Sequence, residues 1–369
     1  MKNSKLIALA LVVIAVVLGG VLYKASRGHS SGDAEFTIGV LTDLTSYTAE
    51  YGKQEFAGLQ VLADENGPGV RLVVQDTKGS PKDAVSGLAT ILQAQDKPSF
   101  LFTALSSVSM AVLPVAEQKD VLVLCNATSR EVVDSAKNSI RNFPDPQQEV
   151  DFLLDGVVKP RGLRSVALIY VNDEYGKSVD AALRAAVGRV GSAISLSEGY
   201  GFDVSDFRSI IDKLKSSGSD SVICVGYGSQ VGGLIRQLKE SAYKGQVMVT
   251  ALIVNTDSVT GSAGDALDGV VFNGFDYQSG TQELESFLKA FGSKYGGRQS
   301  DIGALAYVGS KLVLHSCESG ATPAQTLQRL RQSSPFSTIL GEVTFDGRSF
   351  IYPLKLYTIR AGSVVAYAP

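Results

Sequence analysis

Short apolar segments alternate with amphipathic helical segments along most of the chain, and this alternation constrains the fold more than any other feature. The first half holds four apolar runs that fit buried strands: "FTIGVLTDL", "VRLVVQDT", "PSFLFTAL" and "VLVLCNAT". Helical patterns that begin near Tyr51, Pro81 and Ser106 separate them. Runs that are apolar on both faces are typical of a parallel sheet covered by helices, so this half predicts a doubly wound α/β unit.

The same pattern returns in the second half of the chain. "SVALIYVND", "SAISLSEGY", "DSVICVGYG" and "QVMVTAL" alternate with helical patterns near Glu174, Asp203 and Gln230. With 369 residues and 44% hydrophobic content, the chain is long enough to bury two cores. We therefore expect an α/β protein with two doubly wound parallel-sheet lobes.

The tetrapeptide EYGK occurs once in each half, at Glu50–Lys53 and at Glu174–Lys177. Each copy follows an expected strand and begins an expected helix, which places it at the carboxyl edge of a sheet, where open α/β sheets bind ligands. Two such edges facing each other would form a cleft with one tyrosine on each wall. The alternative is that Tyr-Gly is a plain strand-to-helix turn in which glycine supplies a permissive backbone. Both interpretations stay open here.

Composition narrows the class of partner. The formal net charge of -3 provides no basic surface for nucleic acid. Cys125, Cys224 and Cys317 are odd in number and far apart, which indicates buried thiols rather than a disulfide framework. We therefore expect a small-molecule partner and no nucleic acid.

Residues 1–34 have the features of an export signal or a membrane anchor followed by a linker. Lys2 and Lys5 precede Leu6–Leu22, a run of apolar and glycine residues that just reaches the roughly 17 to 25 residues of a membrane-spanning helix. The next stretch, "YKASRG", lacks the alternating small residues of a cleavage site, which favours an uncleaved apolar helix over a removed signal peptide. Either alternative predicts a periplasmic or extracytoplasmic location, with an anchor at residues 6–22 in the first case.

Several stretches occur in an order and spacing shared with a known family. They include "YGKQEFAGLQVLADE", "LVVQDTKGSPKDAV", "VALIYVNDEYGKSV", "DFRSIIDKLKSSGSDSVICVGYG" and "SAGDALDGVVF". From about Phe36 to its end the chain resembles the type I periplasmic solute-binding proteins of the leucine, isoleucine and valine branch, which serve ABC transporters. The resemblance implies two lobes that close on a small ligand and are joined by three hinge crossovers, near "NFPDP", "FNGFDYQ" and "TFDGRSFIYPL". Lobe 1 would comprise residues 35–144 and 276–345, and lobe 2 residues 145–275 and 346–369.

The resemblance also implies ligand-binding residues on lobe 1. It places Tyr51 in the cleft wall, Ser106 or Ser107 at the serine that receives a ligand carboxylate, and Asn126 with Thr128 in a second carboxylate-binding loop. The serines precede the helical segment "VSMAVLPVAEQ", and unpaired amides at a helix start together with hydroxyl donors can bind an anion. Simple capping by Ser106, and a capping box in "TSRE", remain alternatives that are compatible with anion binding.

On lobe 2 the resemblance places Tyr175 and Tyr227 at two tyrosine positions of the site. Their rings would cover the apolar part of a ligand and their hydroxyls could donate to it, while packing at a sheet edge is the alternative. The overlapping "GYGSQVGG" is one residue too long for a dinucleotide turn and lacks the following acid, so we expect no nucleotide cofactor.

One position departs from the family pattern. Amino-acid-binding members carry an acid on the following lobe 2 strand, where this chain has Leu252. A leucine cannot balance a buried ammonium, and an unpaired buried charge costs on the order of several kcal/mol. This favours a carboxylate without an α-amine, aliphatic or aromatic, unless Asp257, Asp276 or Asp301 supplies the acid.

Catalytic groups are scarce. His29 belongs to the linker, and His315 stands two residues from Cys317 in a helical segment, so the two side chains point to different faces. Paired cysteines and metal-binding histidine spacings are missing from the sequence. The sequence therefore predicts a protein that is not an enzyme and needs no cofactor or metal.

The leading hypothesis is an extracytoplasmic solute-binding protein of an ABC uptake system. It would bind a small carboxylate or amino-acid-like ligand by lobe closure and present the closed form to permease subunits in the inner membrane. The alternative is a membrane-tethered ligand sensor or interaction module with the same fold, which an uncleaved anchor would suit.

Overall fold

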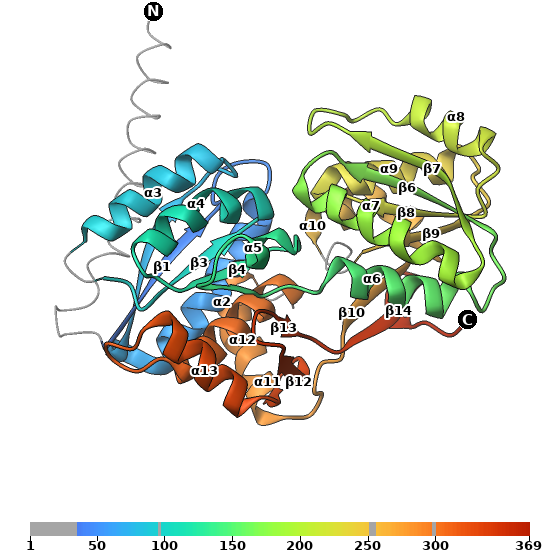
Figure 1. Ribbon diagram of the computed structural model, residues 1–369. Helices are drawn as coiled ribbons and strands as arrows, with labels where there is room; N and C mark the ends of the chain where they lie inside the picture. The colour runs from blue at the N-terminus through green and yellow to red at the C-terminus, as the bar shows by residue number, and fades with distance from the viewer. Residues whose placement is uncertain (1–34, 95–96, 251–255, 297–299) are drawn as a thin grey trace, which may run out of the picture.

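The computed structural model describes residues 35–94, 97–250, 256–296 and 300–369. Figure 1 shows two lobes side by side, each built on a sheet with helices on both faces. The expected α/β fold, with two parallel-sheet lobes joined by three crossovers, is confirmed. The apolar helix expected at residues 6–22 lies outside the described residues.

Lobe 1 contains a parallel sheet in the order β2-β1-β3-β4-β5. Its strands are β1 (Phe36–Thr42), β2 (Val70–Asp76), β3 (Phe100–Ala104), β4 (Val123–Asn126) and β5 (Ser139–Arg141). Its helices are α2 (Ala49–Asn66), η1 (Gly67–Gly69), α3 (Pro81–Gln93), α4 (Ser106–Gln118), α5 (Glu131–Asp134), α11 (Gln282–Tyr295), α12 (Asp301–Ser316) and α13 (Pro323–Ser333).

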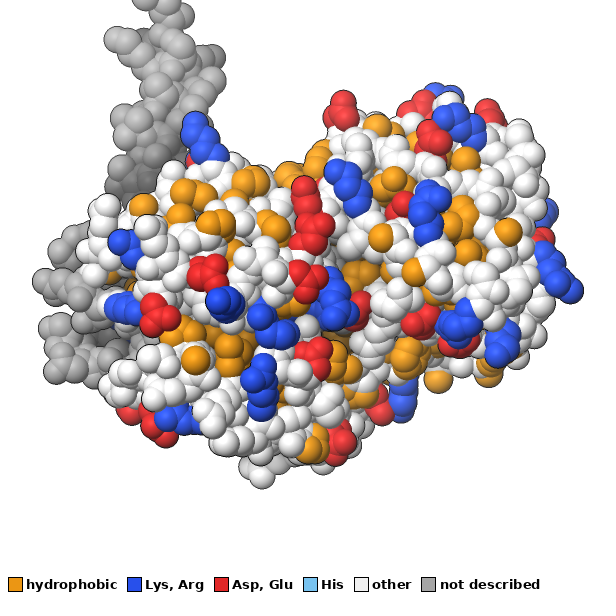
Figure 2. Space-filling model, in the orientation of Figure 1, with side chains coloured by type: hydrophobic (Ala, Val, Ile, Leu, Met, Phe, Trp, Pro, Cys, Tyr) orange, Lys and Arg blue, Asp and Glu red, His pale blue; other side chains and the backbone are white. Residues whose placement is uncertain are grey.

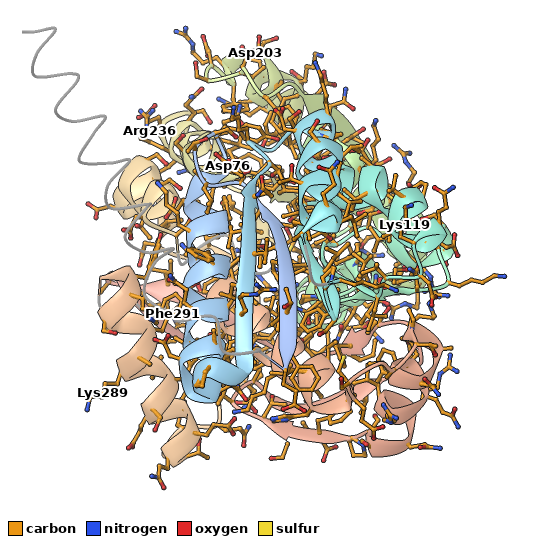
Figure 3. The ribbon with its side chains drawn as sticks, turned by 90° about the vertical axis from the view of Figure 1, so that its left-hand side faces the viewer. Asp76, Lys119, Asp203, Arg236, Lys289 and Phe291 are labelled. Atoms are coloured by element: carbon orange, nitrogen blue, oxygen red, sulfur yellow. The ribbon has the colours of Figure 1, made fainter. Side chains whose placement is uncertain are left out.

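The two faces of this sheet bury two different sets of apolar side chains. Ile38 and Val40 of β1 pack into the core beneath α2, α11 and α12, whereas Leu41 packs into the core beneath α3 and α4. This alternation follows from the two-residue period of a strand. Figure 3 shows the same sorting on α11, where Phe291 is buried against lobe 1 and Lys289 points outward.

Lobe 2 contains a larger sheet in the order β15-β14-β10-β9-β8-β6-β7. Its strands are β6 (Ser165–Val171), β7 (Ala193–Tyr200), β8 (Ser221–Val225), β9 (Gln246–Val249), β10 (Val271–Phe275), β14 (Leu354–Arg360) and β15 (Ser363–Ala366). Its helices are α6 (Pro146–Leu153), η2 (Leu154–Val158), α7 (Glu174–Ala186), η3 (Val187–Val190), α8 (Arg208–Ser216), α9 (Gly228–Glu240), α10 (Asp257–Ala263) and η4 (Gly264–Leu267). The strands from β7 to β10 are parallel, but β14 and β15 form an antiparallel hairpin at the β10 edge that the sequence did not predict.

The chain passes between the lobes after β5, after β10 and after β13. A small antiparallel sheet of β11 (Phe336–Thr338), β12 (Gly341–Phe345) and β13 (Phe350–Ile351) precedes the last passage. β13 ends at Ile351 and β14 of lobe 2 begins at Leu354, so the chain enters lobe 2 through Tyr352 and Pro353. The lobe boundaries given above stay a prediction.

The face shown in Figure 2 is hollowed between the lobes and carries charged side chains of both signs. Its charged groups do not gather into one large basic surface, which agrees with the small net charge. Within the described ranges, no helix is long and apolar enough to cross a membrane. The predicted anchor lies outside those ranges.

Candidate functional site

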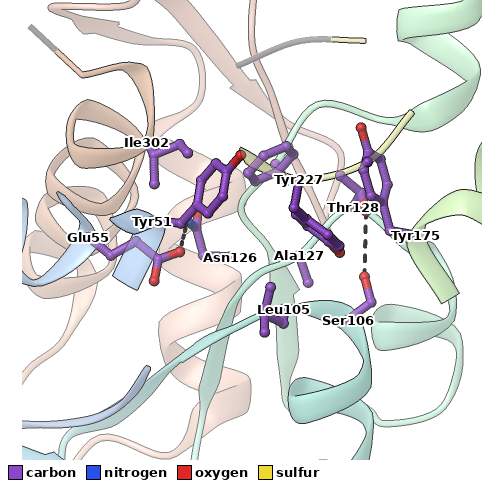
Figure 4. A pocket seen from close by; sticks show the side chains of 12 residues that line it. Tyr51, Glu55, Leu105, Ser106, Asn126, Ala127, Thr128, Tyr175, Tyr227 and Ile302 are labelled. Atoms are coloured by element: carbon purple, nitrogen blue, oxygen red, sulfur yellow. Dashed lines mark hydrogen bonds between the residues drawn. The ribbon is translucent and has the colours of Figure 1, made fainter. Parts of the chain in front are cut away.

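A cavity lies between the lobes at the ends of the parallel strands. In the described conformation it holds about 60 Å³ of space that the centre of a water-sized molecule can occupy, and it is partly open to solvent. The lining residues come from both lobes and are Tyr51, Glu55, Leu105, Ser106, Asn126, Ala127, Thr128, Phe143, Tyr175, Gly226, Tyr227 and Ile302 (Figure 4). None of these described lining residues is a lysine or an arginine.

Most of the residues expected at the site line this cavity. They are Tyr51, Ser106, Asn126, Thr128, Tyr175 and Tyr227. Ser107 is half-buried at the start of α4 but is not part of the cavity wall, so the structure distinguishes the two neighbouring serines. Leu252 lies outside the described residues. Ligand contact by these residues stays a prediction.

The polar wall of lobe 1 is built where β3 passes into α4. Leu105 joins the two elements with φ 66°, an unusual backbone conformation for a residue with a side chain, and Ser106 follows as the first residue of the helix. The Ser106 hydroxyl accepts a hydrogen bond from the Ser129 backbone N–H at 3.2 Å and lies 3.5 Å from the Thr128 hydroxyl. Because either hydroxyl can donate in this pair, one of the two hydroxyl protons is left for a ligand. The first amides of α4 add positive electrostatic potential.

The glycines of the two EYGK segments explain how the helices begin so close to the strands. A Cβ atom on Gly52 would lie 1.8 Å from the carbonyl oxygen of Asp43, and one on Gly176 would lie 1.9 Å from that of Val171. Only a residue without a side chain fits at either position. Each lobe therefore uses the repeated segment for a close helix-to-loop contact, and the tyrosine before each glycine lines the cavity.

The first EYGK segment also crosses the cleft. The Tyr51 hydroxyl accepts a hydrogen bond from the Gly228 backbone N–H at 2.7 Å, at the start of α9 on lobe 2. The Glu50 carboxylate accepts from the Asp257 backbone N–H at 2.6 Å, and also from the backbone N–H and hydroxyl of Ser258, at the start of α10. Burial raises the pKa of Tyr51 to about 12, so its hydroxyl is neutral near pH 7. These bonds hold the lobes together in the described conformation.

Aromatic rings form the apolar wall. The Tyr227 ring centroid lies 5.7 Å from that of Tyr175 and 6.0 Å from that of Tyr51. The Tyr227 hydroxyl donates to the Asp173 carboxylate at 2.9 Å, and the Tyr175 hydroxyl shares a hydrogen bond with Thr250. Burial raises the pKa of both tyrosines well above the ordinary value, so both remain neutral. Because the Tyr227 hydroxyl proton is donated to Asp173, it is not free for a ligand, contrary to the expectation from the sequence.

The aromatic wall continues to the surface. The Phe202 ring stacks on Tyr227 at a centroid distance of 6.3 Å, and Tyr47 lies 4.8 Å from Phe202. Tyr47 belongs to lobe 1 and Phe202 to lobe 2, and their exposed fractions are 53% and 44%. Rings from both lobes therefore meet at the mouth of the cleft.

Glu55 is the lining residue of greatest chemical interest that the sequence analysis missed. Its carboxyl group is 4% exposed and accepts hydrogen bonds from the Thr42 hydroxyl at 2.6 Å and from the Asn126 side-chain amide at 2.7 Å. Burial raises its pKa to about 7, and repulsion from Asp43 adds to the shift. Glu55 stands four residues after Tyr51, on the same helix face, and that spacing could have revealed it.

A buried polar chain connects Glu55 with two of the crossovers. The Asn142 side-chain amide donates to the Asn126 side-chain oxygen at 3.1 Å, and the Tyr352 hydroxyl donates to the Asn142 side-chain oxygen at 2.6 Å. Asn142 follows β5, and Tyr352 follows β13. The cavity wall and the crossovers therefore share one hydrogen-bond network.

The acids that remained as alternatives to Leu252 stand away from the cavity wall. Asp276 forms an ion pair with Lys355 at 2.7 Å, and Asp301 accepts a hydrogen bond from the Tyr277 hydroxyl at 2.6 Å. Asp257 is exposed at the start of α10. Among the described residues, Glu55 is the carboxyl group that lines the cavity.

Comparison with known proteins assigns the chain to a family. The family model for periplasmic binding protein matches residues 35–363. An amino acid binding protein of Pseudomonas aeruginosa is 26% identical over 334 residues, covering 85% of this chain and 86% of the relative.

Two solved structures show the same fold. The branched-chain amino acid transporter substrate binding protein of Streptococcus pneumoniae, in complex with isoleucine, has a TM-score of 0.79 at 20% identity and covers 90% of this chain and 98% of its own. A solute binding protein of an ABC transporter from R. palustris, in complex with 4-hydroxybenzoate, has a TM-score of 0.77 at 18% identity and covers 90% of this chain and 96% of its own. These relatives are binding proteins and not enzymes. The chain belongs to the periplasmic binding protein family.

Proposed function

We propose that this protein binds a small carboxylate between its lobes and delivers it to an ABC permease. The observation that carries the proposal is the interlobe cavity, in which the hydroxyls of Ser106 and Thr128 meet at the start of α4, opposite an aromatic wall. Hydroxyl donors and free helix amides suit an anion, and the rings suit an apolar body. Isoleucine and 4-hydroxybenzoate, the ligands named for two proteins of the same fold, both carry a carboxylate.

A carboxylate without an α-amine fits this chain better than an α-amino acid. Leu252 stands where the amino-acid-binding members have the acid that holds the ammonium, and Asp257, Asp276 and Asp301 do not line the cavity. A ligand ammonium at the usual position would remain unpaired in a buried site.

Binding proceeds by closure of the lobes. The ligand first meets the hydroxyls of lobe 1, and closure then brings Tyr175 and Tyr227 of lobe 2 against it. The cross-lobe bonds of Glu50 and Tyr51 form only when the lobes meet, so they add to the stability of the closed state. The permease recognises the closed shape.

We place the protein in the periplasm, with residues 6–22 as its attachment to the inner membrane if they are retained. The second candidate is a tethered ligand sensor, which the apolar run followed by a poor cleavage site favours. Co-purification separates the two: transport predicts recovery of permease and ATPase subunits with the ligand-bound chain, whereas sensing predicts a signalling enzyme.

Isothermal titration calorimetry tests ligand class and site together. We expect a benzoate or a short aliphatic carboxylate to bind, and leucine and isoleucine to bind more weakly. Ser106→Ala and Thr128→Ala should each weaken binding about 10-fold, because each removes a hydrogen bond to a charged group. Ser107→Ala is the matched control and should leave the affinity unchanged. Equal affinities in all three variants and the parent chain would refute the site.

A further inference from the structure

We infer that Glu55 is the specificity residue of the cavity and selects an aromatic carboxylate with a hydrogen-bond donor at the far end of its ring. The inference rests on the proposed function, because it assumes a carboxylate at Ser106 and Thr128. Its basis is the position of Glu55 in the cavity wall, its burial, and the two bonds that orient its carboxyl group.

The carboxyl group of Glu55 retains the capacity to accept. Thr42 donates to one oxygen and Asn126 donates to the other, so each oxygen holds one hydrogen bond from the protein. At a pH above its pKa of about 7 the Glu55 carboxyl group is ionised, and an ionised carboxylate has about four acceptor positions, which leaves places for a ligand donor. No lysine or arginine among the described lining residues compensates the charge. A ligand hydroxyl or amine that reaches Glu55 would therefore add a third hydrogen bond to a buried carboxylate that has only two from the protein.

The arrangement of the cavity defines the shape of the ligand. Figure 4 shows Glu55 on one side and Ser106 on the other, with Leu105, Ala127 and the rings of Tyr51 and Tyr227 between them. A ligand that meets both sides has a carboxylate at one end, a flat apolar body in the middle and a donor at the other end. An α-amino acid carries both polar groups on one carbon, whereas a 4-hydroxy or 4-amino aromatic acid carries them at opposite ends of the ring.

Asn126 helps to fix this specificity. Its side-chain nitrogen donates to Glu55, and its side-chain oxygen accepts from Asn142. Asn142 therefore fixes the orientation of Asn126, and Asn126 fixes that of the Glu55 carboxyl group. A carboxyl group oriented in this way loses little conformational freedom when a ligand donor arrives. The side chain is a prearranged acceptor at the end of the aromatic wall.

The test is calorimetry at a pH above the Glu55 pKa of about 7, on the full-length chain as recovered from the expressing cell, with 4-hydroxybenzoate, benzoate, 4-fluorobenzoate and isoleucine. We expect 4-hydroxybenzoate to bind about 10-fold or more tightly than benzoate, because its hydroxyl can donate an additional hydrogen bond to Glu55 and benzoate has no such donor. 4-Fluorobenzoate has a similar shape but cannot donate, so it should bind like benzoate.

The matched protein variant is Glu55→Gln. A glutamine can keep both protein bonds, since its oxygen can accept from Asn126 and its nitrogen can donate to the Thr42 hydroxyl, but it carries no charge. The preference for 4-hydroxybenzoate over benzoate should fall about 5-fold or more, while the affinity for benzoate should change little. Glu285→Gln, on the exposed surface of α11, is the control and should change neither affinity. Thermal unfolding of each variant confirms that it is folded.

The outcomes separate this inference from the proposed function. Equal affinities for benzoate and 4-hydroxybenzoate, in both the parent chain and Glu55→Gln, overturn the inference and leave carboxylate binding intact. Preferred binding of isoleucine also overturns it, because that ligand has no donor at a distance from its carboxylate. No binding of any of the four acids overturns the inference, and it contradicts the proposed function as well if short aliphatic carboxylates also fail to bind.

Discussion

Replacing Glu50 by alanine should open the protein, because this side chain connects the lobes. In the described conformation its carboxylate accepts hydrogen bonds from the Asp257 backbone N–H at 2.6 Å and from Ser258. Glu50 belongs to α2 on lobe 1, while both donors belong to the first turn of α10 on lobe 2. The contact acts as a helix cap supplied by the opposite lobe.

The size of the effect follows from this geometry. Loss of a helix cap costs about 0.5 to 2 kcal/mol, and a negative charge at a helix N-terminus contributes about 0.3 to 1 kcal/mol. Because Glu50 is partly exposed, water compensates part of the loss, and we take about 1 to 2 kcal/mol. A difference of about 1.4 kcal/mol is a factor of ten, so the ratio of closed to open molecules should fall roughly 5- to 30-fold.

Double electron–electron resonance measures this ratio directly. Nitroxide labels on cysteines placed at Lys119 of lobe 1 and Asp203 of lobe 2, both exposed, report closed and open distances in a background in which Cys317 is serine. The Glu285→Ala variant removes a first-turn glutamate from α11 of the same lobe and should match the parent chain. If Glu50→Ala and Glu285→Ala give the same distance distribution, the cross-lobe cap does not contribute to closure.

Three further results are expected. Gly176→Ala should lower the free energy of unfolding, measured by urea denaturation, by about 1 to 3 kcal/mol, because its Cβ would lie 1.9 Å from the Val171 carbonyl oxygen. Gly233→Ala is the control: its Cβ would have no neighbour within 4 Å, so the free energy of unfolding should change by less than about 1 kcal/mol. The free energy of unfolding of the parent chain, relative to that of Glu55→Gln, should fall by about 3 kcal/mol as pH rises from 4.5 to about 7. The reason is that the pKa of Glu55 is higher in the folded than in the unfolded state, so in this pH range the folded state binds more protons. A constant difference between pH 5 and pH 8 would contradict this. Tyr175→Ala should weaken 4-hydroxybenzoate binding about 10-fold by removing one ring of the aromatic wall, and an unchanged affinity would argue against that wall.

Much of the fold could be predicted from local patterns. Strands β1, β3 and β8 are buried on both faces, so they appear in the sequence as short apolar runs, and each is followed by a helical period. The antiparallel pairing of β14 with β10 was not predicted, because β14 is an ordinary half-exposed strand and β10 lies far away in the sequence. Pairing between distant segments has no local signal.

The site could be predicted only in part, for a related reason. Ser106 and Tyr175 follow strand ends directly, so their place at the sheet edge follows from the strand-to-helix order. Ile302 reaches the cavity from α12, and Phe143 from a crossover, and nothing in their local sequence indicates this. Glu55 is an intermediate case, because its helical spacing from Tyr51 was visible but its burial was not.

The sequence alone determined the two α/β lobes, the glycines that let α2 and α7 begin against their strands, and the tyrosines at the sheet edges, because all of these depend on residues close together in the chain. The tertiary structure decided that Tyr51 bonds to lobe 2, that Glu50 caps α10, and that Glu55 becomes a buried acceptor bonded to Thr42 and Asn126. Apart from the Thr42 bond, which spans 13 residues, these contacts join residues 71 to 207 positions apart. They arise only when the chain is packed and water is removed, since burial and hydrogen-bond partners are properties of the packed molecule and not of any one segment.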